Sequence, residues 1–222
     1  MKNLTLIIPA KQEYDSLPIF LKELKNFSCH ISVIIEDNDE KTKNCLNEFD
    51  EVKIIYQKKR GYGSAIIEGI NKCSTEYCCI INADGSMNPK YLKKMLDDCK
   101  DNDFIFASRY LKPDGGSEDD TFITYIGNKI FTLIGNILFN LKISDILFTF
   151  ILGKTSSFKS LNLNSQDFRL CVEIPIKAKK KKLSYSSIAC FERKRIAGFK
   201  KVNELKDGFL ILCGMLNYIF KK

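Results

Sequence analysis

The sequence has no paired-cysteine motif, almost no histidine and no apolar run long enough to cross a bilayer. Its nine cysteines include no C-x-x-C pair, and the single histidine, His30, leaves no zinc-binding constellation. The odd cysteine count and the lack of a secretion signal indicate reduced thiols packed as small apolar side chains, and therefore a cytoplasmic protein. The apolar runs fall short of the ~20 residues that span a membrane.

Two signatures of other nucleotide-binding enzymes are also absent. The first apolar segment, residues 4–8, is followed by Pro9-Ala10-Lys11-Gln12. A nucleotidyltransferase would need a glycine-rich loop at this place, and a dinucleotide-dependent oxidoreductase would need G-x-G-x-x-G. Both enzyme classes are therefore disfavoured, although their sheets would be similar.

The composition suits one α/β domain or two small ones, since 45% of the 222 residues are apolar. The 35 basic and 27 acidic residues leave a net charge of +8. This balance predicts an anionic partner such as a nucleotide, a lipid phosphate or a membrane surface. The basic residues gather late in the chain without interleaved exposed aromatics, which disfavours nucleic-acid binding.

Apolar strand-like segments alternate with segments of helical spacing through the first half of the chain. The predicted strands are residues 4–8, 31–35, 52–56, 77–81 and 104–107. This alternation predicts an α/β fold with a mostly parallel sheet and helices on both faces. The polar strand ends should then meet along one rim, and they carry Glu13, Asp37, Arg60, Asp84 and Arg109.

The segment C-C-I-I-N-A-D-G-S-M-N-P at 78–89 organises this prediction. Its strand ends in Asn82-Ala83-Asp84-Gly85-Ser86, and Pro89 suits the first turn of the following helix. Asp84 is a hard oxygen ligand of the kind that Mg²⁺ or Mn²⁺ takes when bridging protein to a nucleotide diphosphate. The alternative is an ordinary turn, in which these residue types are common.

The second half is predicted to contain a mobile loop and two amphipathic helices. The loop covers residues 112–120, and the helices cover 122–141 and 204–220. Both helices are too short or too polar to span a bilayer but suit a membrane interface. Between them, the sequence predicts an extended segment at 145–152, helices at 155–161 and 168–178, a strand at 183–191 and a basic stretch at 192–201.

With these segments in order, the sequence resembles the inverting glycosyltransferases of family 2, and among them the dolichyl-phosphate mannose synthases and bacterial polyprenyl-phosphate glycosyltransferases. The similar motifs extend over almost the whole chain. They are I-I-P-A-K-Q-E at 7–13, I-I-E-D-N-D-E-K-T at 34–42, R-G-Y-G-S-A at 60–65, N-A-D-G-S at 82–86, A-S-R-Y at 107–110, S-D-I-L-F-T-F at 144–150, E-I-P-I-K-A at 173–178 and R-I-A-G-F-K-K at 195–201.

This resemblance implies a GT-A type nucleotide-diphospho-sugar transferase fold. A single domain would cover residues 1–201, with a nucleotide-sugar-binding half over 1–110 and an acceptor-side half over 111–201. An amphipathic C-terminal helix would cover 202–222.

The resemblance also implies roles for individual residues. Donor binding is assigned to Pro9, Ala10 and Glu13 in the base and ribose pocket, Asp37 at the base N–H, and Arg60 and Gly63 near the nucleotide. Asn82 and Ala83 are also assigned to substrate binding. The metal, Mg²⁺ or Mn²⁺, is assigned to Asp84 with Asn82 and Ser86 beside it. Phosphate charge from donor or acceptor is assigned to Arg109, Arg195 and Lys201.

The implied reaction is displacement at the anomeric carbon of a nucleotide-diphospho-sugar by a metal-dependent hexosyltransferase. The expected acceptor is a polyprenyl phosphate, which is ionised at neutral pH and needs no general base. A sugar hydroxyl would need a carboxylate, and the candidates are Asp145, Asp167 and Glu173. The family position favours Asp145, whereas helix capping and a lysine partner are the alternatives for Asp167 and Glu173. The catalytic set is therefore Asp84, Asp145, Arg109 and Arg195.

Two residues depart from the family pattern. Asn82 replaces the first acid of D-x-D, which should lower metal affinity, and Lys200 stands where serine is usual. Two alternatives therefore remain: a family-2 enzyme acting on a sugar hydroxyl in cell-surface polysaccharide synthesis, and a catalytically impaired nucleotide-sugar-binding homologue. The chain carries no multi-span tail, so we expect membrane contact to be peripheral, on the cytoplasmic face.

Overall fold

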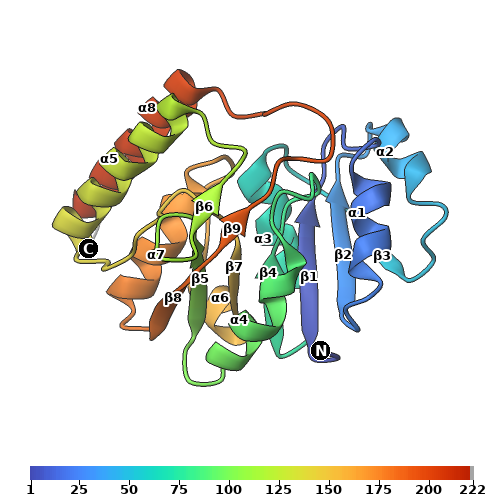
Figure 1. Ribbon diagram of the computed structural model, residues 1–222, viewed down its shortest axis with the longest axis horizontal. Helices are drawn as coiled ribbons and strands as arrows, with labels where there is room; N and C mark the ends of the chain where they lie inside the picture. The colour runs from blue at the N-terminus through green and yellow to red at the C-terminus, as the bar shows by residue number, and fades with distance from the viewer. Residues whose placement is uncertain (221–222) are drawn as a thin grey trace.

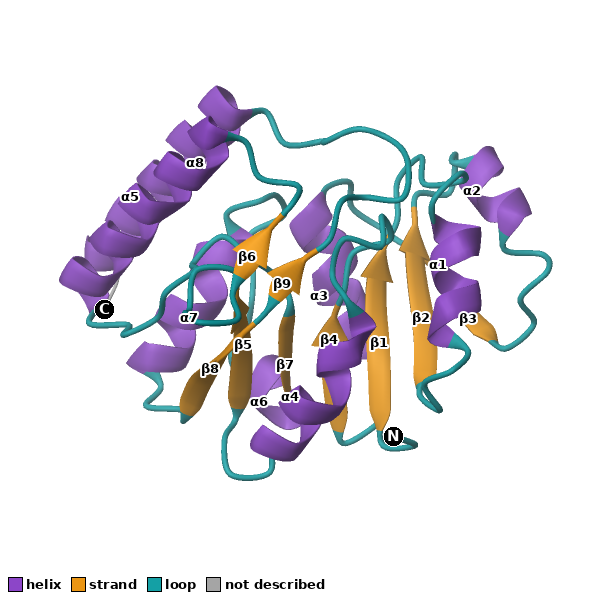
Figure 2. Ribbon diagram, viewed as in Figure 1, coloured by secondary structure: helices purple, strands orange, loops and turns teal. Residues whose placement is uncertain are grey.

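A computed structural model describes residues 1–220 and contains a seven-stranded sheet with the order β3-β2-β1-β4-β7-β5-β8. Helices cover both faces of this sheet (Figures 1 and 2). The strands are β1 (Leu4–Pro9), β2 (His30–Ile35), β3 (Val52–Tyr56), β4 (Tyr77–Ile80), β5 (Phe104–Ser108), β6 (Gly116–Ser117), β7 (Ile151–Lys154), β8 (Tyr185–Ala189) and β9 (Phe191–Glu192). Since β7 alone pairs antiparallel with its neighbours β4 and β5, the other strands of the sheet share one direction.

The helices fill the predicted positions between the strands. They are α1 (Leu17–Leu24), α2 (Glu40–Cys45), α3 (Tyr62–Lys72), the 3₁₀ helix η1 (Pro89–Tyr91), α4 (Leu92–Asp98), α5 (Phe122–Phe139), α6 (Thr155–Ser160), α7 (Leu170–Lys180) and α8 (Glu204–Phe220). Asp39 caps α2 by accepting a hydrogen bond from the backbone N–H of Thr42. The predicted α/β fold with a mostly parallel sheet is confirmed.

The sheet separates two apolar cores. Alternate residues of β1 point to opposite faces, so Leu6 packs with Phe20 of α1 on one side while Ile7 packs with Ile66 of α3 on the other. A strand buried on both faces must be apolar throughout, which explains the continuous apolar runs in the sequence.

Several element ends differ from the sequence-based prediction. Only the last part of the segment 145–152 joins the sheet, as β7. The strand expected at 183–191 is divided, because β8 pairs with β5 whereas β9 pairs with β6.

Helices α5 and α8 lie side by side at one end of the molecule, and α8 also packs against α7 (Figure 1). Ile211 and Met215 of α8 are buried in the core, whereas Phe209 is 67% exposed. Among residues 1–220, α5 is the one helix that is long and apolar enough to cross a membrane, with a mean hydropathy of 1.3, although its sequence suggested that it was too polar. Length and composition alone are weak evidence, and α5 uses Asn128 and Thr132 to bond to the domain.

The two predicted halves of the chain contribute to a single sheet, because β7 from the second half lies between β4 and β5 of the first. Helix α8, beyond the predicted boundary at residue 201, packs on the core, and the domain bounds remain a prediction. Residues 221–222 of the predicted C-terminal helix lie outside the described residues.

Candidate functional site

The carboxyl ends of β1 to β5 lie at one rim of the sheet, and residues 193–201 cross this rim (Figure 1). We call residues 193–201 the crossing segment. Its backbone is fixed to the end of β4, because the N–H of Ile196 donates to the carbonyl of Asp84 at 2.8 Å and the N–H of Arg193 donates to the carbonyl of Ser86 at 2.9 Å. The basic stretch is therefore placed directly over the predicted donor site.

Asp84 lies under the crossing segment and is only 7% exposed. Its Oδ1 accepts hydrogen bonds from the backbone N–H and the hydroxyl of Ser86, at 3.0 and 2.9 Å. Its Oδ2 lies 3.5 Å from Nη1 of Arg195. The turn depends on Gly85, whose φ is +74° and whose missing Cβ would stand 2.4 Å from Cδ1 of Ile196.

Asn82, at the position of the missing acid, is held by a half-buried tyrosine. Its Oδ1 accepts a hydrogen bond from the hydroxyl of Tyr62 at 2.9 Å, and that hydroxyl also lies 2.6 Å from Oγ1 of Thr149. Burial raises the pKa of Tyr62 well above its ordinary value, so the phenol stays a neutral donor. Tyr62 was not predicted as a site residue, although it lies inside the R-G-Y-G-S-A motif.

The residues at the end of β4 can supply a few of the ligands of a divalent metal ion. Within the described residues 1–220, no three His, Cys, Asp or Glu side chains gather closely enough to hold a metal ion. Mg²⁺ commonly binds through one or two carboxylates plus substrate phosphates, so Asp84 is sufficient for the protein's part of such a site. Its Oδ2 accepts no hydrogen bond from the described residues, whereas Asn82 and Ser86 are already engaged. Metal binding by these three residues remains a prediction.

The residues predicted for the base and ribose pocket lie at the ends of β1 and β2. Pro9 ends β1, and the N–H of Ala10 donates to the carbonyl of Ile34 at 2.9 Å. Glu13 is 8% exposed and pairs with Lys201, which stands 188 positions away in the sequence. The structure therefore brings together two residues that the sequence analysis assigned to substrate binding in different roles.

The acidic turn after β2 carries Asp37, whose role at the base N–H remains a prediction. Asp37 is exposed, whereas its neighbour Glu36 is buried and pairs with Lys11 at 3.0 Å and with Arg60 at 4.0 Å. Glu36 was not predicted as a site residue, although it stands in the same I-I-E-D-N-D-E motif. The Arg60 side chain is 80% exposed, and its role near the nucleotide remains a prediction.

Close packing requires glycine at position 63, which the sequence did not reveal. A Cβ at this position would stand 2.2 Å from the carbonyl oxygen of Ser165. The neighbouring N–H of Ser64 donates to the carbonyl of Gln166 at 3.1 Å. Close approach of these two backbones therefore requires glycine, and the role of Gly63 near a nucleotide remains a prediction.

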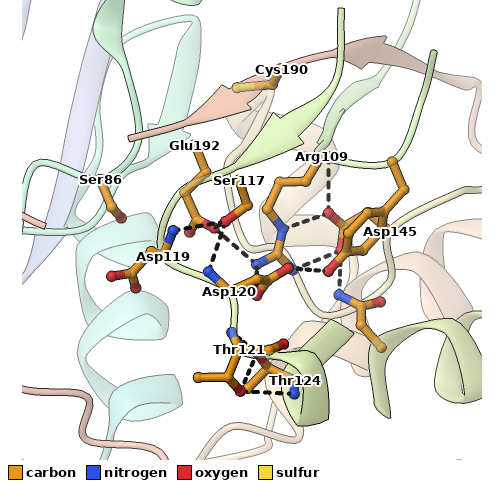
Figure 3. A network of polar contacts seen from close by, with 12 residues as sticks. Ser86, Arg109, Ser117, Asp119, Asp120, Thr121, Thr124, Asp145, Cys190 and Glu192 are labelled. Atoms are coloured by element: carbon orange, nitrogen blue, oxygen red, sulfur yellow. Dashed lines mark hydrogen bonds and ion pairs between the residues drawn. The ribbon is translucent and has the colours of Figure 1, made fainter. Parts of the chain in front are cut away.

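Arg109 lies at the centre of a buried polar network (Figure 3). Its Nε and Nη2 donate to Asp145 at 2.8 and 3.0 Å, and its Nη1 donates to Asp120 and Glu192, both at 3.1 Å. Burial disfavours the charged guanidinium, but Asp145 and Glu192 outweigh this effect and hold the pKa of Arg109 well above its ordinary value. A phosphate would have to compete with three carboxylates here, so phosphate binding by Arg109 remains a prediction.

Asp145 has the contacts of a positioning residue. Its side chain is fully buried and accepts hydrogen bonds from the backbone and side chain of Arg109 and from Nδ2 of Asn128. The other two acids considered as bases have structural partners. Glu173 pairs with Lys177 at 2.6 Å, as the lysine-partner alternative predicted, and Asp167 accepts hydrogen bonds from Arg169.

The loop at residues 112–120, which was expected to be mobile, is bonded to both Arg195 and Arg109 at the rim. The hydroxyl of Ser117 accepts hydrogen bonds from the N–H groups of Asp119 and Asp120, whose side chains turn to opposite sides (Figure 3). Asp119 faces Arg195, with Nη2 to Oδ2 at 2.9 Å, whereas Asp120 accepts from Arg109. The acidic run in a basic chain was the available sequence signal, and it was interpreted only as a loop.

The family model described as glycosyl transferase family 2 matches residues 5–161. A dolichol-phosphate mannosyltransferase of Pyrococcus furiosus is 27% identical over 193 residues, which are 82% of this chain and 54% of that protein. An uncharacterized glycosyltransferase of Mycobacterium tuberculosis is 25% identical over 92 residues, or 41% of each protein. The chain thus spans about half the length of these curated relatives or less.

Among solved structures, the chain is similar to glucosyl-3-phosphoglycerate synthase of Mycobacterium tuberculosis in complex with Mn²⁺, UDP-glucose and phosphoglyceric acid. The TM-score is 0.78 at 10% identity, covering 100% of this chain and 81% of that one. At this identity the likeness establishes the GT-A fold alone, as the sequence resemblance predicted. The family model, in contrast, matches well over half of the sequence. The chain therefore belongs to glycosyl transferase family 2.

Proposed function

We propose that the chain transfers a sugar from a nucleotide-diphospho-sugar to an acceptor, with inversion at the anomeric carbon. The observation that carries this proposal is the buried carboxylate of Asp84 at the carboxyl end of β4, facing Arg195 of the crossing segment at 3.5 Å. A carboxylate and a guanidinium at the rim of a parallel sheet suit a diphosphate, because ligands bind at this edge and arginine matches phosphate geometry.

The leaving diphosphate requires positive charge as its bond to the sugar breaks. Arg195, Lys200 and Lys201 of the crossing segment lie at the rim, each beside a carboxylate that a phosphate can replace as partner. A bound Mg²⁺ or Mn²⁺ would be held by Asp84, with Asn82 and Ser86 beside it, and would supply further stabilisation of the leaving group. The glucosyl-3-phosphoglycerate synthase structures of the same fold, solved with Mn²⁺ or Mg²⁺, support such use.

We propose a polyprenyl phosphate as the acceptor. The name of the Pyrococcus furiosus relative supports this choice, and so do the apolar side chains exposed on α5 and α8. A lipid phosphate is ionised at neutral pH and can attack the anomeric carbon without a general base. This acceptor fits the absence of a free carboxylate at Asp145, whose oxygens are engaged by Arg109 and Asn128.

A sugar hydroxyl is the second candidate acceptor, and the acid-rich network at Arg109 favours it. Three carboxylates surround this one guanidinium, which opposes entry of an anionic acceptor. Burial also raises the pKa of Glu192, which makes it a stronger base than an exposed glutamate. A hydroxyl acceptor needs such a base.

The helix pair supports peripheral membrane association as part of this proposal. Exposed apolar side chains gather on α5 and α8, including Phe122, Ile130, Ile137, Leu205 and Phe209. The net charge of +8 adds attraction to an anionic surface. Because α5 is bonded to the domain along one face, we propose that it lies on the bilayer surface rather than across it.

The proposal is tested by incubating the purified chain with a panel of nucleotide sugars and either a short-chain polyprenyl phosphate or a set of free sugars. Transfer to the polyprenyl phosphate with inverted configuration supports the first acceptor, and transfer to a sugar supports the second. Nucleotide binding without transfer or donor hydrolysis would instead support the catalytically impaired homologue. Absence of both binding and transfer across the panel would contradict the proposed function.

A further inference from the structure

The turn after β4 carries one carboxylate, Asp84, where the family pattern has two acids. The cationic side chain of Arg195 already faces this carboxylate. Asn82 contributes a neutral amide that is occupied by the hydroxyl of Tyr62 at 2.9 Å. The remaining carboxylate, Asp84, has one oxygen bound by Ser86 and the other directed at Arg195. Such a site attracts a divalent cation less strongly than paired carboxylates would, because ligand charge sets the affinity.

Arg195 is held in place before any ligand arrives. Its side chain is 18% exposed, and Asp119 accepts hydrogen bonds from its Nε at 3.3 Å and its Nη2 at 2.9 Å. Asp119 is itself fixed through its N–H to Ser117 and through its carbonyl to Lys200. The third nitrogen of Arg195, Nη1, is thereby directed toward Asp84 without a full hydrogen bond.

Around Arg195, the carboxylates are balanced by side-chain cations without a metal ion. Asp84 and Asp119 face Arg195, Lys200 lies 3.8 Å from Asp119, and Glu13 faces Lys201. Each of these cations can exchange its carboxylate for a phosphate oxygen. A second acid at position 82 would disturb this balance and would require an added cation.

From this arrangement we infer that Arg195 supplies much of the positive charge that a divalent cation brings to a nucleoside diphosphate in the family pattern, so that this chain binds the diphosphate with little dependence on metal. The inference rests on the proposed function and adds that a protein side chain, Arg195, supplies the positive charge opposite the diphosphate. Metal bound at Asp84 then adds to binding but is not a condition for it.

The test is isothermal titration calorimetry with UDP and with GDP, in EDTA and in Mn²⁺. For each variant we divide the dissociation constant in EDTA by the dissociation constant in Mn²⁺. A general loss of folded protein affects both constants and cancels in this ratio. For whichever of UDP and GDP binds more tightly, the wild-type affinity in EDTA should lie within roughly tenfold of the affinity in Mn²⁺. The reason is that an arginine–phosphate pair is worth about 1.5–3 kcal/mol. Arg195→Met should weaken binding in EDTA by roughly 10–100-fold, and more than in Mn²⁺.

Asn82→Asp provides the converse experiment, because it restores the second acid. This variant should lose affinity in EDTA, and its ratio should rise by roughly tenfold or more over that of the wild type. Lys194→Met is the matched control. Lys194 is an exposed cation of the same crossing segment, next to Arg195 in sequence, so its replacement should leave the ratio unchanged.

The possible failures are distinguishable. Strong binding in Mn²⁺ with none in EDTA, or a ratio that Arg195→Met does not change, would overturn this inference and leave the proposed function intact. Absence of binding under both conditions, for UDP, GDP and the whole nucleotide-sugar panel, would overturn both. An unchanged ratio in Asn82→Asp would overturn the part of the inference that rests on the missing acid.

Discussion

The carboxylate of Asp145 accepts hydrogen bonds from both Nε and Nη2 of Arg109, at 2.8 and 3.0 Å, and the Asp145 side chain is fully buried. This two-point contact joins the segment before β7 to the end of β5. It fixes the plane of the guanidinium and so directs Nη1 at Asp120 and Glu192. The pair therefore organises the acceptor side of the rim.

Asp145→Asn should lower the free energy of unfolding by about 3–5 kcal/mol, because it leaves the buried Arg109 without its principal counter-charge. Urea unfolding followed by circular dichroism measures this loss. Asp97→Asn is the control, since Asp97 pairs with Lys100 at the surface and its replacement should leave the unfolding curve nearly unchanged. A loss below about 1 kcal/mol for Asp145→Asn would show that the network repacks around the amide.

Glu173 predicts an acid-dependent part of the stability. Burial pushes its pKa upward, but hydrogen bonds from Lys177 and from the N–H groups of Asn164 and Ser165 outweigh burial, so the pKa lies below its ordinary 4.5. A lowered pKa in the folded state adds stability that is present above about pH 4.5 and is lost as the pH falls through the folded pKa. Glu173→Gln should remove this contribution.

The measurement is the free energy of unfolding of wild type and Glu173→Gln at pH 7 and at pH 3. The variant should be less stable by about 1–3 kcal/mol at pH 7, and the two proteins should converge at pH 3. A difference that stays constant with pH would instead mean that the substitution acts through packing alone.

Two glycines predict opposite effects of the same substitution. At Gly63, a Cβ would stand 2.2 Å from the carbonyl oxygen of Ser165, so Gly63→Ala should destabilise the fold by about 1–3 kcal/mol. At Gly127, within α5, a Cβ would meet nothing within 4 Å, so Gly127→Ala should stabilise by about 0.5–1 kcal/mol. Thermal unfolding of the two variants compares them directly, and equal shifts would contradict the close approach of the 165–167 backbone.

These cases also indicate which features the sequence could predict. Strands buried on both faces are continuous apolar runs, and their polar ends mark the rim, so the sheet and its edge were predicted correctly. The partners of Arg109 stand 11, 36 and 83 positions away, and such pairings leave no local pattern. The crossing segment was visible as a basic stretch, but only the fold places it over Asp84.

The helix pair predicts binding to anionic membranes. Phe209 of α8 and Ile137 of α5 are 67% and 71% exposed, and burial of each such side chain in a bilayer is worth about 1.5–3 kcal/mol. The wild type should float with phosphatidylglycerol vesicles at low salt, and the double variant Phe209→Ser with Ile137→Ser should not. Ile19→Ser is the control, because Ile19 is 55% exposed on α1, at the other end of the molecule (Figure 1). Wild-type protein that stays at the bottom of the gradient would contradict membrane association.

Asp84→Ala separates the roles of the carboxylate and of its guanidinium partner. Removal of the carboxylate should abolish transfer, because the protein's ligand for a metal on the leaving diphosphate is lost. It should also abolish the gain in nucleotide affinity that Mn²⁺ gives, whereas binding in EDTA should persist because Arg195 remains anchored by Asp119. Calorimetric titration of UDP and GDP with and without Mn²⁺ measures both effects.

Asp114→Ala, in the exposed loop before β6, is the matched control and should bind and react as the wild type does. An Asp84→Ala protein that keeps its full response to Mn²⁺ would show that the metal binds elsewhere. One that loses nucleotide binding in EDTA as well would show that Asp84, and not Asp119, holds Arg195 in its binding position. The two residues lie on either side of the same guanidinium, so this variant decides which of them prepares it for phosphate.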